Sequence, residues 1–389
     1  MAKLGEVCDI LNGYAFKSNQ YTTSGVRIIR ISNVQKGYIE DKSPVYYPCD
    51  DENVKKYELK QNDLLISLTG NVGRTALLEE KFLPAALNQR VSCVRLKEPD
   101  KVLKTYLFHL LNSDYFEQQC MKAAEGVAQK NLSPKWLFEY KIPIYSIERQ
   151  KEISNTLDKI DLLIILRKQQ LAKLDELVKA RFVEMVGDVL LNSMQWPEKT
   201  LENMADIVSG ITKGRKTAEA DLQEVPYMAV SNVKDGYIDW TTVKTILATR
   251  QEIEQYRLMP DDILMTEGGD PDKVGRGAII KVPLKNSIHQ NHIFRVRLDE
   301  QEILPSFFAE YLRHQKAKRY FLGCAKQTTG IASINMRQLR ALPTLVPPLS
   351  LQKQFAAFVE RVDRQKQTIQ QSLEKLELMK KALMQEYFG

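Results

Sequence analysis

The residues with the most recognisable chemistry in this chain form isolated patterns and no complete catalytic set. The segment GITKGRKT at Gly210–Thr217 resembles a phosphate-binding loop, but Arg215 stands where such a loop needs a glycine before its lysine. His289 and His292 have an H-x-x-H spacing, yet no cysteine or acidic ligand set accompanies them at metal-binding distance in the sequence. We therefore expect no nucleotide site and no metal site, and interpret the histidines as a surface or strand-end pair.

Two enzymatic activities on DNA can be compared directly with the sequence. An adenine methyltransferase needs a tetrapeptide such as NPPY or DPPY and an F-x-G-x-G segment, and the chain contains neither. A nuclease site needs a proline–aspartate pair at short range upstream of E-x-K, which Glu58-Leu59-Lys60 lacks. A stand-alone methyltransferase or nuclease is therefore the weaker interpretation, and we expect a chain without catalytic residues or cofactors of its own.

The composition permits a polyanionic partner without requiring one. The chain has 56 Lys and Arg residues against 49 Asp and Glu residues, a formal net charge of +7. Its 5 cysteines are scattered and include no C-x-x-C pair, which is typical of reduced thiols. The opening MAKLGEVCDI has no signal-peptide pattern, and the apolar patch Leu162–Leu166 is far too short to span a bilayer. We expect a cytoplasmic protein with no membrane partner.

The chain repeats itself at a spacing of about 200 residues, the signature of a tandem duplication. The segment ISNVQKGYIE at Ile31–Glu40 returns as VSNVKDGYID at Val230–Asp239. NDLLIS at Asn62–Ser67 returns as DDILMT at Asp261–Thr266, and the loop that follows is longer in the second copy. Each half is therefore predicted to be a globular domain followed by a long helix. The predicted boundaries give domains at 1–146 and 191–347 and helices at 147–190 and 348–389.

Apolar residues recur at alternating spacings of four and three in Ile147–Met185 and in Leu349–Tyr387. This period of about 3.5 residues is that of a coiled-coil seam, and neither segment contains Pro or Gly. At 1.5 Å per residue each helix would be about 55–60 Å long, and we expect the two to pack antiparallel. The predicted seam residues are Ile153, Leu157, Ile160, Ile164, Leu171, Leu174, Val178, Phe355, Val359, Val362, Ile369, Leu373, Leu376 and Leu383.

The globular halves mix strand and helix signals, which predicts an α+β fold for each. Short runs rich in β-branched residues indicate strands at Val26–Ser32, Asn62–Leu68, Gln89–Leu96 and His292–Leu298. Aromatic and leucine residues at helical spacing indicate helices at Thr105–Cys120 and Pro305–Gly323.

Small polar and basic residues recur on the turns of both halves. Asn and Gln can form paired hydrogen bonds with adenine, Arg can do so with guanine, and glycine-rich loops suit phosphates. The alternative is that Asn, Ser and Gly simply form turns, and that Arg74 and Arg276 are structural. The candidate DNA-binding residues are Lys17, Ser32, Asn33, Thr69, Asn71, Arg74, Asn88, Gln89, Arg90, Lys213, Arg215, Lys216, Ser231, Asn232, Lys273, Arg276, Gln290 and Asn291.

Together these features resemble the specificity (S) subunit of type I restriction–modification systems over essentially the whole chain. The motifs that carry the resemblance are LGEVCDILNGYAFKS, SNV-x-x-GYI, D-L-L-I-S-x-T-G-x-x-G-R, PIYSIERQKEI and PPLSLQKQF, together with the two heptad helices. The resemblance implies a non-catalytic subunit whose two target-recognition domains each read half of a bipartite, asymmetric site in double-stranded DNA.

The resemblance also implies partners. The paired helices would act as a spacer that docks two methyltransferase subunits, and restriction subunits would join through these. The partners would use S-adenosylmethionine to methylate adenine N6. They would also bind Mg²⁺ and use ATP to translocate before cleavage. One departure is the acidic second loop, with Glu267, Asp270 and Asp272, whose carboxylates can accept from cytosine N4 but also repel phosphates. The rival interpretation is a coiled-coil scaffold that does not read DNA.

Overall fold

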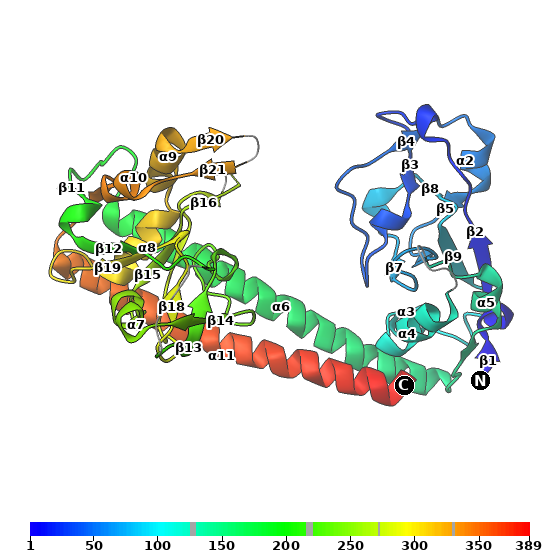
Figure 1. Cartoon of the computed structure of the whole chain (residues 1–389). Coiled ribbons are helices and arrows are strands. Elements are labelled where there is room, and N and C mark those ends of the chain that lie inside the picture. The colour runs from blue at the N-terminus through cyan, green and yellow to red at the C-terminus, as the bar shows by residue number, and fades with distance from the viewer. Residues whose placement is uncertain (125–129, 215–220, 271–272, 329–330) are drawn as a thin grey trace. The chain divides into compact units, whose positions relative to one another are not determined.

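The computed structural model describes residues 1–389 except 125–129, 215–220, 271–272 and 329–330 (Figure 1). The chain divides into two compact units, unit 1 (Met1–Gln169 and Gln370–Gly389) and unit 2 (Gln170–Ile369). Each unit combines a globular α+β part with segments of both long helices, α6 (Ile147–Val186) and α11 (Leu349–Phe388). The predicted class, a tandem of mixed units with two long paired helices, is confirmed. No helix in the described part of the chain is long and apolar enough to cross a membrane.

Unit 1 contains two four-stranded sheets, of strand order β2-β9-β6-β7 and β4-β3-β8-β5. The first sheet is antiparallel, whereas β3 and β8 of the second run parallel. Strand β6 reads LLIS and is buried at every position, because both faces of the sheet are covered. The strands are β1 (Ala2–Lys3), β2 (Cys8–Asn12), β3 (Val26–Ile29), β4 (Tyr46–Tyr47), β5 (Glu58–Leu59), β6 (Leu64–Ser67), β7 (Thr75–Leu77), β8 (Ala85–Leu87), β9 (Val91–Leu96) and β10 (Lys141–Ile142). The shorter helices are α1 (Leu4–Val7), α2 (Glu52–Lys56), α3 (Lys104–Leu111), α4 (Asp114–Ala123) and α5 (Pro134–Glu139).

Unit 2 repeats this plan, with the antiparallel sheet β12-β19-β15-β17 and a second sheet β14-β13-β18. A third small sheet, β16-β21-β20, has no counterpart among the sheets that the described residues of unit 1 form. The strands are β11 (Glu198–Thr200), β12 (Ala205–Ser209), β13 (Gln223–Met228), β14 (Lys244–Ala248), β15 (Ile263–Thr266), β16 (Gly268–Gly269), β17 (Gly277–Ile279), β18 (Ile288–His289), β19 (Ile293–Leu298), β20 (Lys326–Thr328), β21 (Ile331–Ser333) and β22 (Pro343–Leu345). The shorter helices are α7 (Arg250–Tyr256), α8 (Pro305–Arg313), α9 (Gln315–Cys324) and α10 (Met336–Arg340).

Within each unit the long helices pack on each other in opposite directions. In unit 1, Asp161 pairs with Lys380, and further along α6 Lys168 pairs with Glu377, so the partner number falls as the α6 number rises. In unit 2, Asp175 pairs with Lys366. Every predicted seam residue is buried or half-buried. The core of unit 1 includes Ile153 and Leu157 with Met384 and Phe388, and that of unit 2 includes Val178 with Phe355 and Val362.

The sequence-based helices at 105–120 and 305–323 are wrong in one respect, because each is two helices. In unit 1 the break lies at Asn112 and Ser113, where the Ser113 hydroxyl accepts a hydrogen bond from Phe116 N at 3.0 Å and so starts α4. A serine at this position satisfies a backbone amide that a new helix leaves free. In unit 2 the equivalent break lies at His314, between α8 and α9.

Candidate nucleic-acid interface

The polar turns of unit 1 lie at one edge because of how its strands pair. Strands β3 and β8 run parallel, so the residues that follow them leave the sheet at the same edge. There Asn88 N donates to Ile29 O at 3.2 Å. At the same edge Leu68 N donates to Arg90 O at 3.0 Å, which brings the loop after β6 next to the turn before β9. Gly70 N donates to Lys130 O at 3.1 Å, which places Lys130 at this edge. Lys130 is a further cation that the sequence did not predict to be part of the site.

The predicted residues of unit 1 differ in how available they are at this edge. Arg74 is half-buried, and its Nη1 donates to Gln35 Oε1 at 2.6 Å, so its guanidinium is held in one position. Arg90 forms no ion pair within the described part of the chain and projects into solvent. The exposed candidates are Lys17, Ser32, Asn71, Gln89 and Arg90, and the half-buried ones are Thr69, Arg74 and Asn88.

Unit 2 presents an equivalent edge built by the same strand pairing. Strands β13 and β18 run parallel, and Gln290 N donates to Met228 O at 3.0 Å. Glu267 N donates to His292 O at 3.0 Å, as Leu68 does to Arg90 in unit 1. The exposed candidates are Lys213, Ser231 and Lys273, the half-buried ones are Arg276, Gln290 and Asn291, and Arg215, Lys216 and the acidic Asp272 lie outside the described residues.

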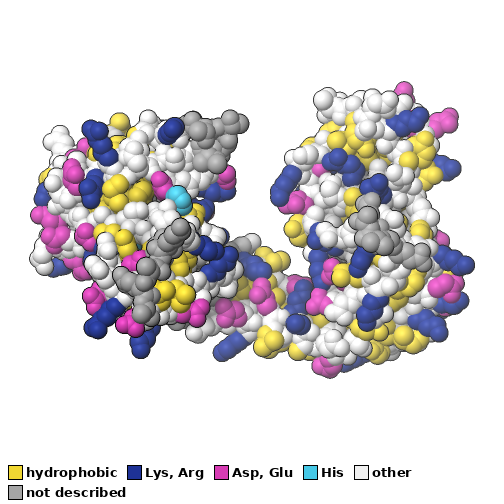
Figure 2. Space-filling model, in the orientation of Figure 1, with side chains coloured by type: hydrophobic (Ala, Val, Ile, Leu, Met, Phe, Trp, Pro, Cys, Tyr) yellow, Lys and Arg dark blue, Asp and Glu magenta, His cyan; other side chains and the backbone are white. Residues whose placement is uncertain are grey.

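The edge of unit 2 is more acidic than that of unit 1. His292 Nδ1 lies 2.6 Å from Glu267 Oε2, and Lys273 pairs with Asp270. Lys273 offsets the charge of Asp270 that would otherwise repel a phosphate, and the loop keeps carboxylate oxygens that can accept from an amino group. In Figure 2, Lys and Arg side chains (dark blue) are interspersed with Asp and Glu on the visible face of each globular part.

The prediction that Asn33 and Asn232 bind DNA is wrong, because both side chains are buried and serve their own hairpins. Asn33 Oδ1 accepts from Arg30 N at 2.8 Å, and its Nδ2 donates to Glu40 O at 2.9 Å. Asn232 repeats this with Ala229 N at 2.9 Å and Asp239 O at 2.9 Å. The turn-forming alternative is therefore correct for these two asparagines.

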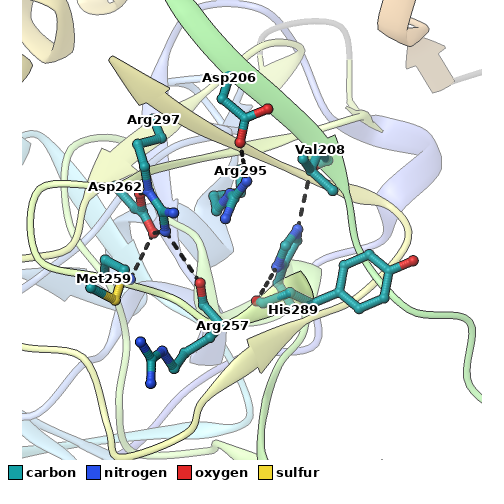
Figure 3. Close-up of polar contacts among 9 residues, drawn as sticks. Asp206, Val208, Arg257, Met259, Asp262, His289, Arg295 and Arg297 are labelled. Carbon is teal, nitrogen blue, oxygen red and sulfur yellow. Dashed lines mark hydrogen bonds and ion pairs between the residues drawn. The ribbon is translucent and has the colours of Figure 1, made fainter. Parts of the chain in front are cut away.

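An ion pair between a buried aspartate and a half-buried arginine recurs in both units. Asp63 binds Arg95 in unit 1 with an Oδ2–Nη2 distance of 2.6 Å, and Asp262 binds Arg297 in unit 2 with an Oδ1–Nε distance of 2.7 Å (Figure 3). Asp63 Oδ2 also accepts from Lys60 N, and Asp262 Oδ2 from Met259 N, so each carboxylate fixes the turn before its strand. Sequence reasoning missed these pairs, although the alignment of Asp63 with Asp262 and of Arg95 with Arg297 could have revealed them.

Two buried polar side chains of unit 2 stand where unit 1 has a cysteine and a leucine. Arg295 and His289 occupy the positions of Cys93 and Leu87. Arg295 pairs with Asp206, and burial lowers its pKa (Figure 3). The ring of His289 lies 3.3 Å from the carbonyl oxygens of both Tyr256 and Val208, and burial lowers its pKa to about 4. His289 ends β18 inside the protein whereas His292 is exposed, and no cluster suited to a metal occurs among the described residues.

The chain therefore consists of two modules of one fold, each with a polar loop edge. The chain matches the family model described as the type I restriction modification DNA specificity domain over residues 1–176 and 194–378, and it belongs to this family. It is accordingly a specificity subunit, which has a role in DNA recognition, assembles with other subunits and is not itself the enzyme.

Similar proteins agree with this assignment. The chain is 20% identical over 395 residues to the type I restriction enzyme EcoKI specificity subunit of Escherichia coli (strain K12), with 96% of this chain and 84% of that protein covered. It is 23% identical over 398 residues to the StySPI specificity subunit of Salmonella potsdam, with 96% and 83% covered. The crystal structure of the type I S subunit from M. genitalium shares the fold with a TM-score of 0.58 at 16% identity, covering 100% of this chain and 95% of that one.

Proposed function

We propose that each globular unit reads one half of a bipartite, asymmetric sequence in double-stranded DNA with its polar edge. The observation that carries this is the duplication itself. The strand pairing and the Asp–Arg pair recur, whereas Thr69–Arg74 and its longer counterpart Glu267–Arg276 differ in length and charge. Two different half-sites require such divergent loops on a common scaffold, because direct readout depends on the few side chains that reach base edges.

The long helices serve in this proposal as a spacer and as the docking surface for two methyltransferase subunits. Part of α6 supports this, because Leu162, Leu163, Ile165 and Leu166 are all exposed. A run of exposed apolar side chains on a helix is typical of a protein–protein contact. Restriction subunits would join through the methyltransferase subunits. S-adenosylmethionine, ATP and Mg²⁺ would be bound by these partners, and all of them would act in the cytoplasm.

Methylation mapping tests the proposal in the cell. Adenine methylation in the host genome is compared with and without this chain, with the methyltransferase subunit present in both. We expect one bipartite motif to lose methylation when the chain is absent. Unchanged methylation would instead favour a scaffold without a role in reading DNA. The purified chain alone, supplied with S-adenosylmethionine or with ATP and Mg²⁺, is expected neither to methylate nor to cleave DNA.

A further inference from the structure

The segment that is most alike in the two units carries an exposed tyrosine in each copy. ISNVQKGYIE of unit 1 and VSNVKDGYID of unit 2 share Ser, Asn, Val, Gly, Tyr and Ile at matching positions. The fold explains most of these identities. The asparagines are buried and form hydrogen bonds within their hairpins, and Val34 and Val233 are core residues. Gly37 and Gly236 have φ of 91° and 85°, which disfavours any side chain.

The fold does not explain why the tyrosine is kept. Tyr38 is 53% exposed and Tyr237 is 61% exposed. Within the described part of the chain, neither ring stacks on another aromatic ring and neither hydroxyl forms a hydrogen bond. A tyrosine that is retained on the surface of both copies without a stacking partner or a hydroxyl hydrogen bond is best explained by an external contact.

Both tyrosines are presented by the same rigid turn. Gln35 N donates to Tyr38 O at 3.0 Å, and Lys234 N donates to Tyr237 O at 3.0 Å. The glycine amide then binds the neighbouring strand, with Gly37 N donating to Thr75 O at 2.8 Å and Gly236 N to Gly277 O at 3.0 Å. The ring therefore projects from an equivalent, fixed place in each unit.

An ion pair with exchanged charges holds each turn against a helix. In unit 1, Lys36 Nζ lies 2.7 Å from Glu117 Oε2 of α4. In unit 2 the equivalent positions hold Asp235 and Lys318 of α9, which lie 3.6 Å apart. Exposed pairs of this kind add little to stability. Their retention with both charges reversed indicates that the position of the turn is what has been kept.

The surroundings of both turns favour a protein over a DNA backbone. Asp114, which also pairs with Lys36, lines a hollow of about 410 Å³ next to α11 in unit 1. Tyr237 itself lines a hollow of about 440 Å³ in unit 2, whose charged lining residues are the carboxylates Asp175, Asp235, Glu310 and Asp363 and the cations Lys281, Arg313 and Lys366. Most of these carboxylates are ion-paired, so the surface around each turn has mixed charge and is not the cationic surface that a DNA backbone requires. Tyrosine is among the residues most enriched at protein interfaces.

We propose that Tyr38 and Tyr237 form the same contact with two copies of one protein partner, the methyltransferase subunit, with one copy at each unit. This inference rests on the proposed function, and adds a docking contact on the globular units to the one on the long helices. Two copies of one partner require the same residue in both units, while two different DNA half-sites do not.

Assembly of the full chain with the methyltransferase subunit of the same system tests this contact. Native mass spectrometry counts the bound copies, and titration gives the affinity of each. Tyr38→Ala and Tyr237→Ala are each expected to weaken one of the two copies about tenfold or more, as loss of an aromatic hot spot does, and the double variant to weaken both. Trp240→Ala is the matched control, since this exposed aromatic has Asp41 at the equivalent position in unit 1.

The ion pair provides a second test that keeps both tyrosines. Lys36→Asp places a carboxylate against Glu117 and is expected to weaken the copy bound at unit 1. Adding Glu117→Lys, together with Asp114→Gln to match Gln315, recreates the charge arrangement of unit 2 and is expected to restore the affinity of that copy.

Two results would overturn the inference. The first is wild-type affinity for both copies in the Tyr38→Ala, Tyr237→Ala double variant. The second is normal assembly of that variant with weakened DNA binding, which would make the tyrosines DNA contacts. In either case, a wild-type complex that still methylates one bipartite motif leaves the proposed function standing.

Discussion

At the scale of single residues, Arg74 and Arg90 lie at the same edge but differ in how firmly each guanidinium is held. Gln35 fixes Arg74 at 2.6 Å, whereas Arg90 is exposed. A held guanidinium is suited to the two-point recognition of a guanine, and a mobile one to a phosphate. We therefore expect Arg74→Ala to cost about 1–3 kcal/mol and to relax one base position only.

Arg90→Ala is the matched comparison for Arg74→Ala. It is expected to weaken binding to all sequences alike and to lower the salt dependence by about one counterion. Binding of the assembled complex to single-base variants of its target, measured at several salt concentrations, separates the two effects. Equal and sequence-independent losses in both variants would contradict the distinction.

His289 makes unit 2 sensitive to acid. Its pKa is lowered by burial from 6.5 to about 4, so between these values the unfolded chain binds a proton that the folded chain does not. The stability of unit 2 should therefore fall as the pH drops through this interval, by about 3 kcal/mol at most. His289→Leu, which copies Leu87 of unit 1, should remove this dependence in urea unfolding measured at pH 7 and pH 4.5. An unchanged acid-induced loss in the variant would show that another group is responsible.

The same scale shows where sequence reasoning on the site fails. Asn33 and Arg74 both looked like turn residues able to reach a base, yet Asn33 is buried under its hairpin. The choice depends on which way a side chain leaves its turn, and that is set by its hydrogen-bond partners: Asp41 of the same hairpin for Asn33, and Gln35 of a distant segment for Arg74.

At the scale of elements, one buried glutamine fastens each long helix to its globular part. Gln150 Oε1 accepts from Leu103 N at 2.8 Å, and its Nε2 donates to Lys101 O and Tyr145 O at 2.8 and 2.9 Å. Gln352 repeats all three bonds with Leu304 N, Glu302 O and Pro347 O.

Replacing Gln150 by Leu leaves these buried backbone groups without partners. Each unsatisfied group costs about 1–3 kcal/mol, so we expect the stability of unit 1 to fall by at least about 2 kcal/mol. Gln169→Leu is the control, because this exposed residue lies on the same helix and should change stability by less than about 0.5 kcal/mol. Denaturant unfolding with hydrogen exchange over α3 gives both values. Equal stability of the two variants would mean that packing alone fixes the helix.

The helices and strands with the most regular apolar periodicity in the sequence were predicted best. The heptad segments were expected at 147–185 and 349–387, and the helices span Ile147–Val186 and Leu349–Phe388. The strand expected at 26–32 stops at Ile29, because Asn33 draws the chain into a turn through Arg30 N. A long apolar period fixes a helix locally, but the end of a short strand depends on a single side-chain hydrogen bond.

At the scale of the whole molecule, the duplication gives each globular part a hydrophobic core of its own. The core of unit 1 and the core of unit 2 are formed from different residues, and each includes its own segments of α6 and α11. A change of loops in one part therefore need not disturb the other, provided that the helices and the two glutamines are retained.

Exchanging residues 1–146 for the corresponding part of a relative should consequently change one half of the methylated motif. The other half should stay, because residues 191–347 still read it, and so should the spacing, because the helices at 147–190 and 348–389 are unchanged. Methylation mapping of a host that carries the hybrid measures all three features at once. A control hybrid that exchanges 191–347 instead should alter the opposite half. If either hybrid changed both halves together, readout would depend on contacts shared by the two parts, and the divergent loops would not be the source of specificity.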